Sequence, residues 1–175
     1  MSAWWERAAG AVRDDFSDLG DPASAVRVLV RLVVAAALGG VLGYEREYEG
    51  KSVGMRTHML VALGAALFVV VPQQAGATAE AMTRVVQGLI AGIGFLGAGA
   101  IMRGPEGWQA KGLTTAAGIW ATAAIGVTAG LGREASAIVA AVLSYVILGL
   151  LPHHFGSQST PPQAPGGGAS KGAGP

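Results

Sequence analysis

Cysteine is absent from this 175-residue chain, and aspartate is absent after Asp21. The first absence excludes a disulfide framework, a thiolate nucleophile and a cysteine metal site. The second excludes an aspartate dyad inside the apolar part of the chain. The sequence also has no His-Glu-x-x-His zinc motif and no Gly-x-Ser-x-Gly nucleophile motif, and Ser144 has no evident general base. We therefore expect a protein that is not an enzyme.

Charge is also scarce. Only 13% of the residues are charged, the formal net charge is +1, and 51% of the residues are hydrophobic. A chain with no basic run does not have the surface that nucleic-acid binding requires. The N-terminus has no basic stretch before an apolar run, so it does not resemble a cleaved signal peptide. This composition is typical of a small integral membrane protein whose first partner is the lipid bilayer.

Five apolar segments predict the fold class: an all-α membrane protein, built as a compact bundle of five transmembrane helices with glycine-rich packing faces. The segments cover about 26–44, 56–72, 84–102, 112–131 and 135–151. The domain division follows from them. Residues 1–25 form an N-terminal segment, either an interfacial amphipathic helix or a plain polar tail; 26–151 form the membrane domain; and 152–175 form a disordered Gly/Pro-rich tail.

Glycine is frequent in these segments, although each interior glycine costs a helix roughly 0.5–1 kcal/mol relative to alanine. Small residues at four-residue spacing let helix backbones approach closely in lipid. Segment 84–102 is the richest in glycine, so we expect it to be the buried central helix and the chain to form a homo-oligomer, such as a dimer. The expected packing glycines are Gly39, Gly43, Gly88, Gly92, Gly94, Gly97 and Gly99.

Basic residues in the short loops predict the orientation. The first and third loops carry more of them than the second and fourth, which places the first and third loops and the C-terminus in the cytoplasm and the N-terminus outside. Arg27 and Arg31, near the start of the first span, favour the opposite orientation. The loop residues counted are Arg46, Lys51, Arg56, Arg103 and Lys111 against Arg84 and Arg133.

Polar residues gather at the ends of the spans, where hydrocarbon tolerates them poorly. We interpret them as a candidate functional cluster that either lines a cavity or forms ion pairs and interhelical hydrogen bonds. Glu45 and Glu49 are weak candidates for a Mg²⁺ site, because Mg²⁺ is held by one or two carboxylates plus waters. No other cofactor is indicated. The cluster comprises Glu45, Arg46, Glu47, Arg56, Thr57, His58, Arg84, Gln87, Lys111, Thr114 and Thr115.

Four motifs, in this order and spacing, resemble the MgtC/SapB family of bacterial inner-membrane proteins, over roughly residues 26–151. They are GYERE (43–47), GMRTHMLVALGAALF (54–68), TRVVQGLIAGIGFLGAGAIM (83–102) and KGLTTAAGIWATAAIGVTAG (111–130). The resemblance implies a five-helix domain in the bacterial plasma membrane, linked to magnesium limitation and, in pathogens, to survival in host cells. Many members carry a soluble C-terminal domain, so this chain resembles the short form.

The resemblance also implies a role. Members are viewed mainly as regulators of other membrane proteins, which makes a non-catalytic regulator connected with Mg²⁺ homeostasis the leading hypothesis. A small transporter or channel and a structural membrane scaffold are the alternatives. Members commonly have an acidic or Asn residue three positions before the arginine matched by Arg84, where this chain has Ala81. The sequence does not identify a ligand, a partner or an oligomer number.

Overall fold

The computed structural model describes residues 3–15, 21–103 and 110–150. In these residues it has six helices and one short antiparallel strand pair, in which Met102 lies opposite Lys111. The expected tail 152–175 lies outside the described residues. The elements in order are α1 (Ala3–Asp15), α2 (Pro22–Tyr48), α3 (Met55–Gln74), α4 (Ala79–Ala100), β1 (Met102–Arg103), β2 (Ala110–Lys111), α5 (Leu113–Gly130) and α6 (Glu134–Leu150).

Local sequence signals explain where the helices begin. Asp21 caps α2 by accepting hydrogen bonds from the backbone of Ala23 and Ser24, and Pro22 occupies the first turn, where its missing N–H costs nothing. The Ser24 hydroxyl donates to the same carboxylate and is the largest cause that lowers the pKa of Asp21. Thr78 caps α4 through Ala81 N. These polar caps fix the helix starts.

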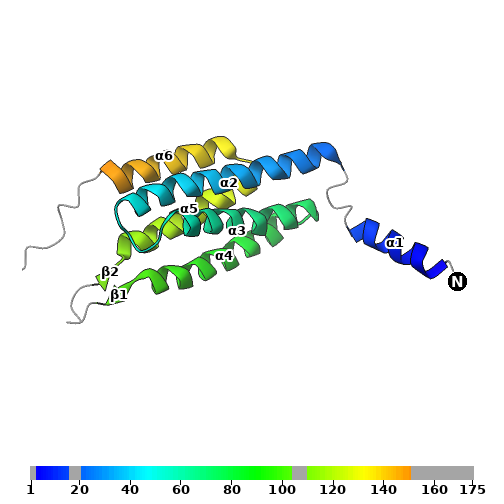
Figure 1. The fold of residues 1–175 in the computed structure, drawn as a ribbon, viewed down its shortest axis with the longest axis horizontal. Helices are drawn as coiled ribbons and strands as arrows, with labels where there is room; N and C mark the ends of the chain where they lie inside the picture. The colour runs from blue at the N-terminus through cyan, green and yellow to red at the C-terminus, as the bar shows by residue number, and fades with distance from the viewer. Residues whose placement is uncertain (1–2, 16–20, 104–109, 151–175) are drawn as a thin grey trace, which may run out of the picture.

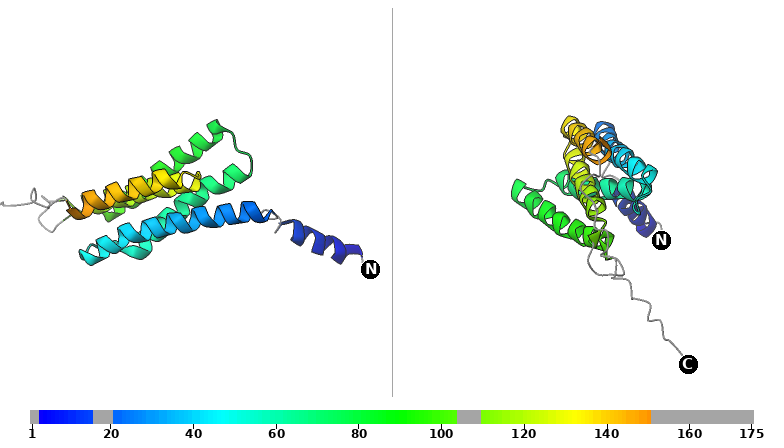
Figure 2. Two further views of the ribbon diagram at one scale, coloured as in Figure 1. Left: turned by 90° about the horizontal axis from the view of Figure 1, so that it is seen from above. Right: turned by 90° about the vertical axis from the view of Figure 1, so that its left-hand side faces the viewer.

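Helices α2 to α6 run side by side along one axis (Figure 1). Helix α3 packs most extensively against α2 and α5, and α6 covers the other side of α2 and α5. The end-on view in Figure 2 shows α4 set apart at one edge of this group. Helix α4 contacts chiefly α5 and, less extensively, α3. The bundle therefore has α2, α3 and α5 at its centre.

Glycines on α2 and α5 lie directly at the central contacts. A Cβ at Gly39 would come 2.5 Å from the carbonyl oxygen of His58, and a Cβ at Gly43 would come 2.5 Å from Cα of Met55. On α5, a Cβ at Gly126 would lie 2.8 Å from Cα of Ala62. Real Cβ atoms do not approach backbone this closely, so only glycine permits these helix separations.

The prediction that segment 84–102 is the buried central helix is wrong. Within α4 only Gly97 is buried. A Cβ at Gly97 would make ordinary contact with Ala116 Cβ at 3.6 Å, whereas a Cβ at Gly88 or Gly92 would meet nothing within 4 Å. The same holds for Gly94 and Gly99. These four glycines therefore make no close contact with another helix, because α4 packs against α5 along one side only.

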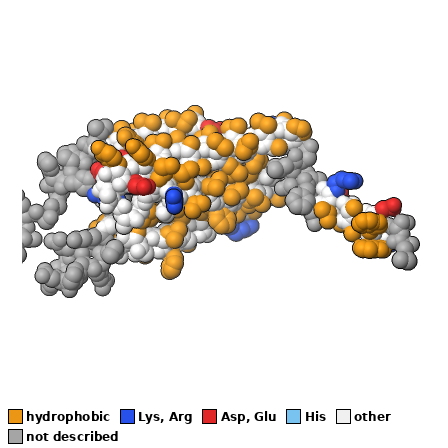
Figure 3. All heavy atoms as spheres, in the orientation of Figure 1, with side chains coloured by type: hydrophobic (Ala, Val, Ile, Leu, Met, Phe, Trp, Pro, Cys, Tyr) orange, Lys and Arg blue, Asp and Glu red, His pale blue; other side chains and the backbone are white. Residues whose placement is uncertain are grey.

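Four helices are long and apolar enough to cross a membrane: α2, α3, α4 and α5. Helix α6 has 17 residues, fewer than the ~20 that span a bilayer perpendicularly, so the fifth span remains a prediction. Exposed hydrophobic side chains cover much of the bundle face in Figure 3, with few charges among them. Apolar exposure on this scale suits contact with lipid.

Arg31 joins four helices at the end of the bundle where α2 begins. From α2 its Nη1 donates to Gln73 Oε1 on α3 at 2.7 Å and to the Gly130 carbonyl at the end of α5 at 3.2 Å. Its Nε lies 4.0 Å from Glu134 at the start of α6. This arginine thus fixes the relative positions of the four helices at that end.

The glycine contacts generate a test. Gly126→Ala should lower the free energy of unfolding by about 1–3 kcal/mol, because the new Cβ overlaps the backbone of Ala62 and forces α3 and α5 apart. Gly88→Ala, the same change on α4, should leave stability equal or slightly higher, because alanine favours helix. Thermal unfolding in detergent, followed by circular dichroism, measures both. Equal losses would contradict the assignment of α4 to the periphery.

Candidate functional site: a buried charge cluster at one end of the bundle

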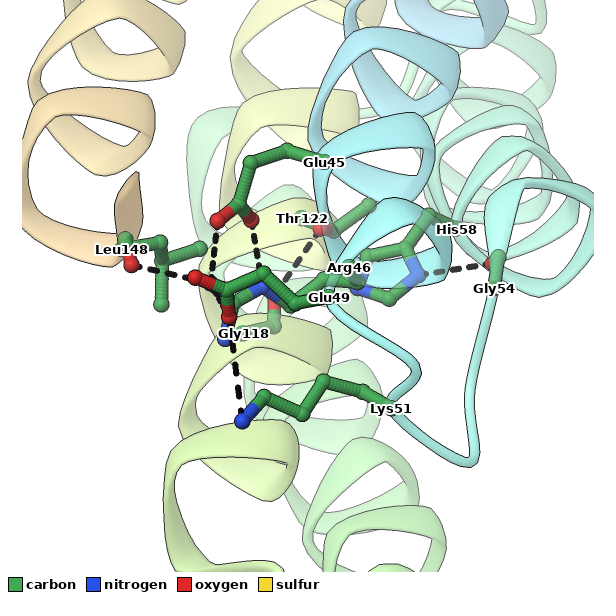
Figure 4. A network of polar contacts seen from close by, with 9 residues as sticks. All are labelled: Glu45, Arg46, Glu49, Lys51, Gly54, His58, Gly118, Thr122 and Leu148. Atoms are coloured by element: carbon green, nitrogen blue, oxygen red, sulfur yellow. Dashed lines mark hydrogen bonds and ion pairs between the residues drawn. The ribbon is translucent and has the colours of Figure 1, made fainter. Parts of the chain in front are cut away.

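Arg46 lies near the C-terminal end of α2 with none of its surface exposed. Its Nε and Nη2 donate to the two carboxylate oxygens of Glu45, which is 7% exposed. Nη2 also donates to the carbonyl oxygen of Leu148 on α6 at 2.9 Å and lies 2.9 Å from Glu49 Oε2 (Figure 4). The arginine therefore ties the end of α2 to α6.

The α2–α3 connection completes this charge network. Lys51 Nζ lies 3.7 Å from Glu49 Oε2, and the Lys51 backbone N–H donates to the Arg46 carbonyl at 3.0 Å. Two carboxylates and two cations thus balance in charge. Buried charges are tolerated when they are paired and hydrogen-bonded in this way.

This pairing corrects the expected end of the first span. The sequence placed that end at Tyr44, before the run of charges, but α2 continues to Tyr48 and buries Glu45 and Arg46 inside the bundle. The side chains can remain there because they neutralise each other and because α6 supplies a carbonyl acceptor.

His58, one turn into α3, lies in the same region with none of its surface exposed. Its Nδ1 lies 2.9 Å from the Gly54 carbonyl oxygen, and its Nε2 has no partner in the described part of the chain. Figure 4 shows the ring extending from Gly54 toward the side chain of Arg46. Arg46 Nη1 also lacks a partner there. The two unpartnered atoms come from residues that the sequence singled out.

Helix α5 forms the remaining wall. Thr115 and Thr122 are buried there, and the Thr122 hydroxyl donates to the Gly118 carbonyl at 2.8 Å. A Cβ at Gly118 would lie 3.7 Å from His58 Nε2. The threonine hydroxyl is thus satisfied by its own helix, as is common for membrane threonines.

Other predicted residues are nearby but outside the buried cluster. Glu47 accepts from Met55 N at 2.9 Å and so caps α3, where a negative charge is favourable. Arg56, Thr57 and Thr114 are exposed. The side chain of Lys111 lies outside the described residues.

Arg84 and Gln87 do not belong to this cluster. They lie in the first turns of α4, and because α3 and α4 run antiparallel, this places them at the opposite end of the bundle (Figure 1). Both are exposed, and Arg84 Nη1 donates to Glu80 Oε1 at 2.7 Å. Ala81, by contrast, makes only its backbone cap contact with Thr78. The single predicted cluster is therefore divided between two ends.

The candidate metal ligands are occupied by protein cations. Glu45 binds Arg46, and Glu49 binds both Arg46 and Lys51. Across residues 3–15, 21–103 and 110–150, no three side chains of the His, Cys, Asp and Glu types gather closely enough to hold a metal ion. The geometry therefore uses these carboxylates as ion-pair partners.

Four contributors to the site were missed by sequence reasoning. The Leu148 acceptor is a backbone carbonyl and has no side-chain signature. Gly149 lies beside Glu45, where a Cβ would make ordinary contact with Glu45 Oε1 at 3.6 Å. Gly118 and Thr122 are spaced one helical turn apart. This spacing is a weak sequence indication that one face of α5 packs against polar side chains.

A second concave feature lies between α3 and α4. This groove, of about 640 Å³, is almost wholly apolar, and Arg84 is its one charged lining residue. Gly64 on α3 and Gly88 and Gly92 on α4 line it, and a Cβ at any of the three would meet nothing within 4 Å. We call this feature the α3–α4 groove.

The buried charge cluster generates a second test. Arg46→Met should destabilise the protein by about 3–5 kcal/mol, because Glu45 is then left buried without a cation. Adding Glu45→Gln should recover much of that loss, since the unpaired charge is removed. Arg84→Met, which breaks an exposed pair, should cost about 1 kcal/mol or less. Thermal unfolding measures all three, and equal losses for the single and double variants would refute the pairing.

Comparison with known proteins agrees with the motifs. The chain is 49% identical over 113 residues to protein SrpB of Synechococcus elongatus, covering 58% of this chain and 62% of that protein. It is 43% identical over 120 residues to protein MgtC of Brucella abortus, covering 69% of this chain and 49% of the relative. Protein MgtC of Salmonella typhimurium is 40% identical over 115 residues, covering 66% and 48%.

The match therefore spans about half to three-fifths of the length of these relatives. No solved structure matches the chain. The model of the MgtC family matches residues 32–155, which include most of α2, all of α3 to α6 and the whole buried charge cluster. The resemblance read from the four motifs is thereby confirmed, and the chain is a membrane protein that belongs to the MgtC family.

Proposed function

We propose that this protein is a non-catalytic regulator in the bacterial inner membrane, that it acts by binding other membrane proteins, and that it serves adaptation to Mg²⁺ limitation. Membership of the MgtC family supports the connection with magnesium. In this proposal α2 to α6 form the membrane domain, with the N-terminus outside and the C-terminus in the cytoplasm. The N-terminal helix α1, whose Trp4 and Trp5 are exposed, lies at the membrane surface.

The observation that carries the proposal is the α3–α4 groove. Interior glycines cost helix stability, yet Gly88 and Gly92 make no close contact within the chain. In lipid, small residues of this kind let a second helix approach closely, and association there depends on such packing. The groove is thus a binding site for one apolar transmembrane helix of a partner protein.

The state of the charged side chains favours regulation over transport. A hydrated pathway leaves polar side chains facing a cavity, whereas Arg46 is held by Glu45, Glu49 and a carbonyl, and Arg84 is held by Glu80. The α3–α4 groove is lined almost wholly by apolar side chains. If the protein were a transporter, proteoliposomes that contain the purified protein would take up solute.

Two α4 variants test the groove as the partner site. Gly92→Leu should fill the groove and remove a stoichiometric membrane partner from gentle detergent extracts. Gly94→Leu, on the same helix but not lining the groove, should retain that partner. Neither change meets another part of the chain within 4 Å at Cβ, so both variants should unfold at the wild-type temperature.

The same variants should separate in the cell. A deletion strain complemented with Gly92→Leu should grow poorly at low Mg²⁺, and one complemented with Gly94→Leu should grow normally. Equal growth and equal co-purification would refute the groove as the regulatory site. Recovery of the wild type as a homo-oligomer alone would replace the partner proposal with self-association, the other use that the sequence predicts for these glycines.

A further inference from the structure

Two polar atoms in the buried charge cluster have no hydrogen-bond partner among the residues that the structure describes: Arg46 Nη1 and His58 Nε2. Both residues are fully buried. A buried polar group without a hydrogen bond costs about 1–3 kcal/mol, so such groups in folded proteins are nearly always satisfied by protein or by an ordered water. Two such atoms in one network indicate a shared ligand.

The His58 ring lies beside the side chain of Arg46 (Figure 4). Nδ1 is directed at Gly54, so Nε2 is directed away from it, toward Arg46 and Thr122 (Figure 4). A Cβ at Gly118 would lie 3.7 Å from Nε2 and 3.9 Å from Leu148 Cδ1, which is ordinary contact. Gly118 therefore brings no side chain of its own between α5 and Nε2.

Hydrogen-bond chemistry defines the ligand. A carbonyl oxygen only accepts, so His58 Nδ1 must carry the proton that it shares with Gly54. In the neutral ring Nε2 is then an acceptor, while Arg46 Nη1 is always a donor. The ligand must accept one hydrogen bond and donate another.

The charge balance of the cluster also restricts which ligand can bind. Glu45 on α2 and Glu49 just after it balance Arg46 and Lys51, and the described parts of α5 and α6 bring no charged side chain to this network. A charged ligand would add an unbalanced buried charge, which is strongly unfavourable. The ligand is uncharged.

We infer that one water molecule binds between Arg46 Nη1 and His58 Nε2, against Gly118 of α5. It completes a hydrogen-bonded chain from the Gly54 carbonyl through His58 and Arg46 to the Leu148 carbonyl. This chain links α3, α2 and α6, and α5 encloses it. The bound water thus satisfies both orphaned atoms and makes the cluster one cooperative unit.

Solid-state NMR of the full chain in lipid bilayers tests this site. A His153→Asn/His154→Asn background leaves His58 as the only histidine, so its labelled ring can be observed alone. The ring should be neutral with the proton on Nδ1, and water protons should give a cross-peak to the His58 ring. Preparation without glycerol or other small alcohols ensures that water is the molecule detected.

Gly118→Ala supplies the matched variant. Its Cβ fits without overlap and lies beside Nε2, so the water cross-peak should be lost while Nδ1 keeps its proton and still donates to the Gly54 carbonyl. Gly97→Ala makes the same change at an ordinary contact on α4 and should keep the cross-peak. Absence of the cross-peak in the wild-type background, or its retention in Gly118→Ala, would overturn the inference.

Discussion

Close backbone contact among α2, α3 and α5 is the constraint on which the rest of this structure depends. Gly39, Gly43 and Gly126 remove the side chains that would hold these helices apart. Tight closure lets α2 extend past Tyr44 and bring Glu45 and Arg46 inside. An arginine with no exposed surface can remain there only because carboxylates and a carbonyl satisfy it at once. The buried charges therefore depend on the close helix packing that the small residues permit.

Helix α4, in contrast, does not pack closely through its glycines. It has more glycines than α2, α3 or α5, yet among them only Gly97 would bring a Cβ within 4 Å of a neighbouring helix. Its one-sided attachment to α5 leaves the α3–α4 groove between it and α3. In the proposed function, the buried charge cluster holds the fold together and the separate α3–α4 groove binds a partner helix.

Sequence reasoning predicted the long apolar helices well, because runs of Ala, Val and Leu bounded by caps have few other outcomes in lipid. It failed where one pattern has two uses. Gly43 and Gly88 look alike in sequence, but only the first contacts a neighbouring helix. The charged run after Tyr44 was read as the end of a span, because the pairing that buries Arg46 depends on Leu148, about a hundred residues away. Tertiary contacts decided both cases.

Disulfide trapping in native membranes tests this arrangement most directly, since the chain has no cysteine of its own. Gly97→Cys with Ala116→Cys should form a disulfide between α4 and α5, because a Cβ at Gly97 lies 3.6 Å from Ala116 Cβ, within the range a disulfide requires. Gly64→Cys with Gly88→Cys, on opposite walls of the α3–α4 groove, should not. Efficient trapping of the second pair and none of the first would contradict the account.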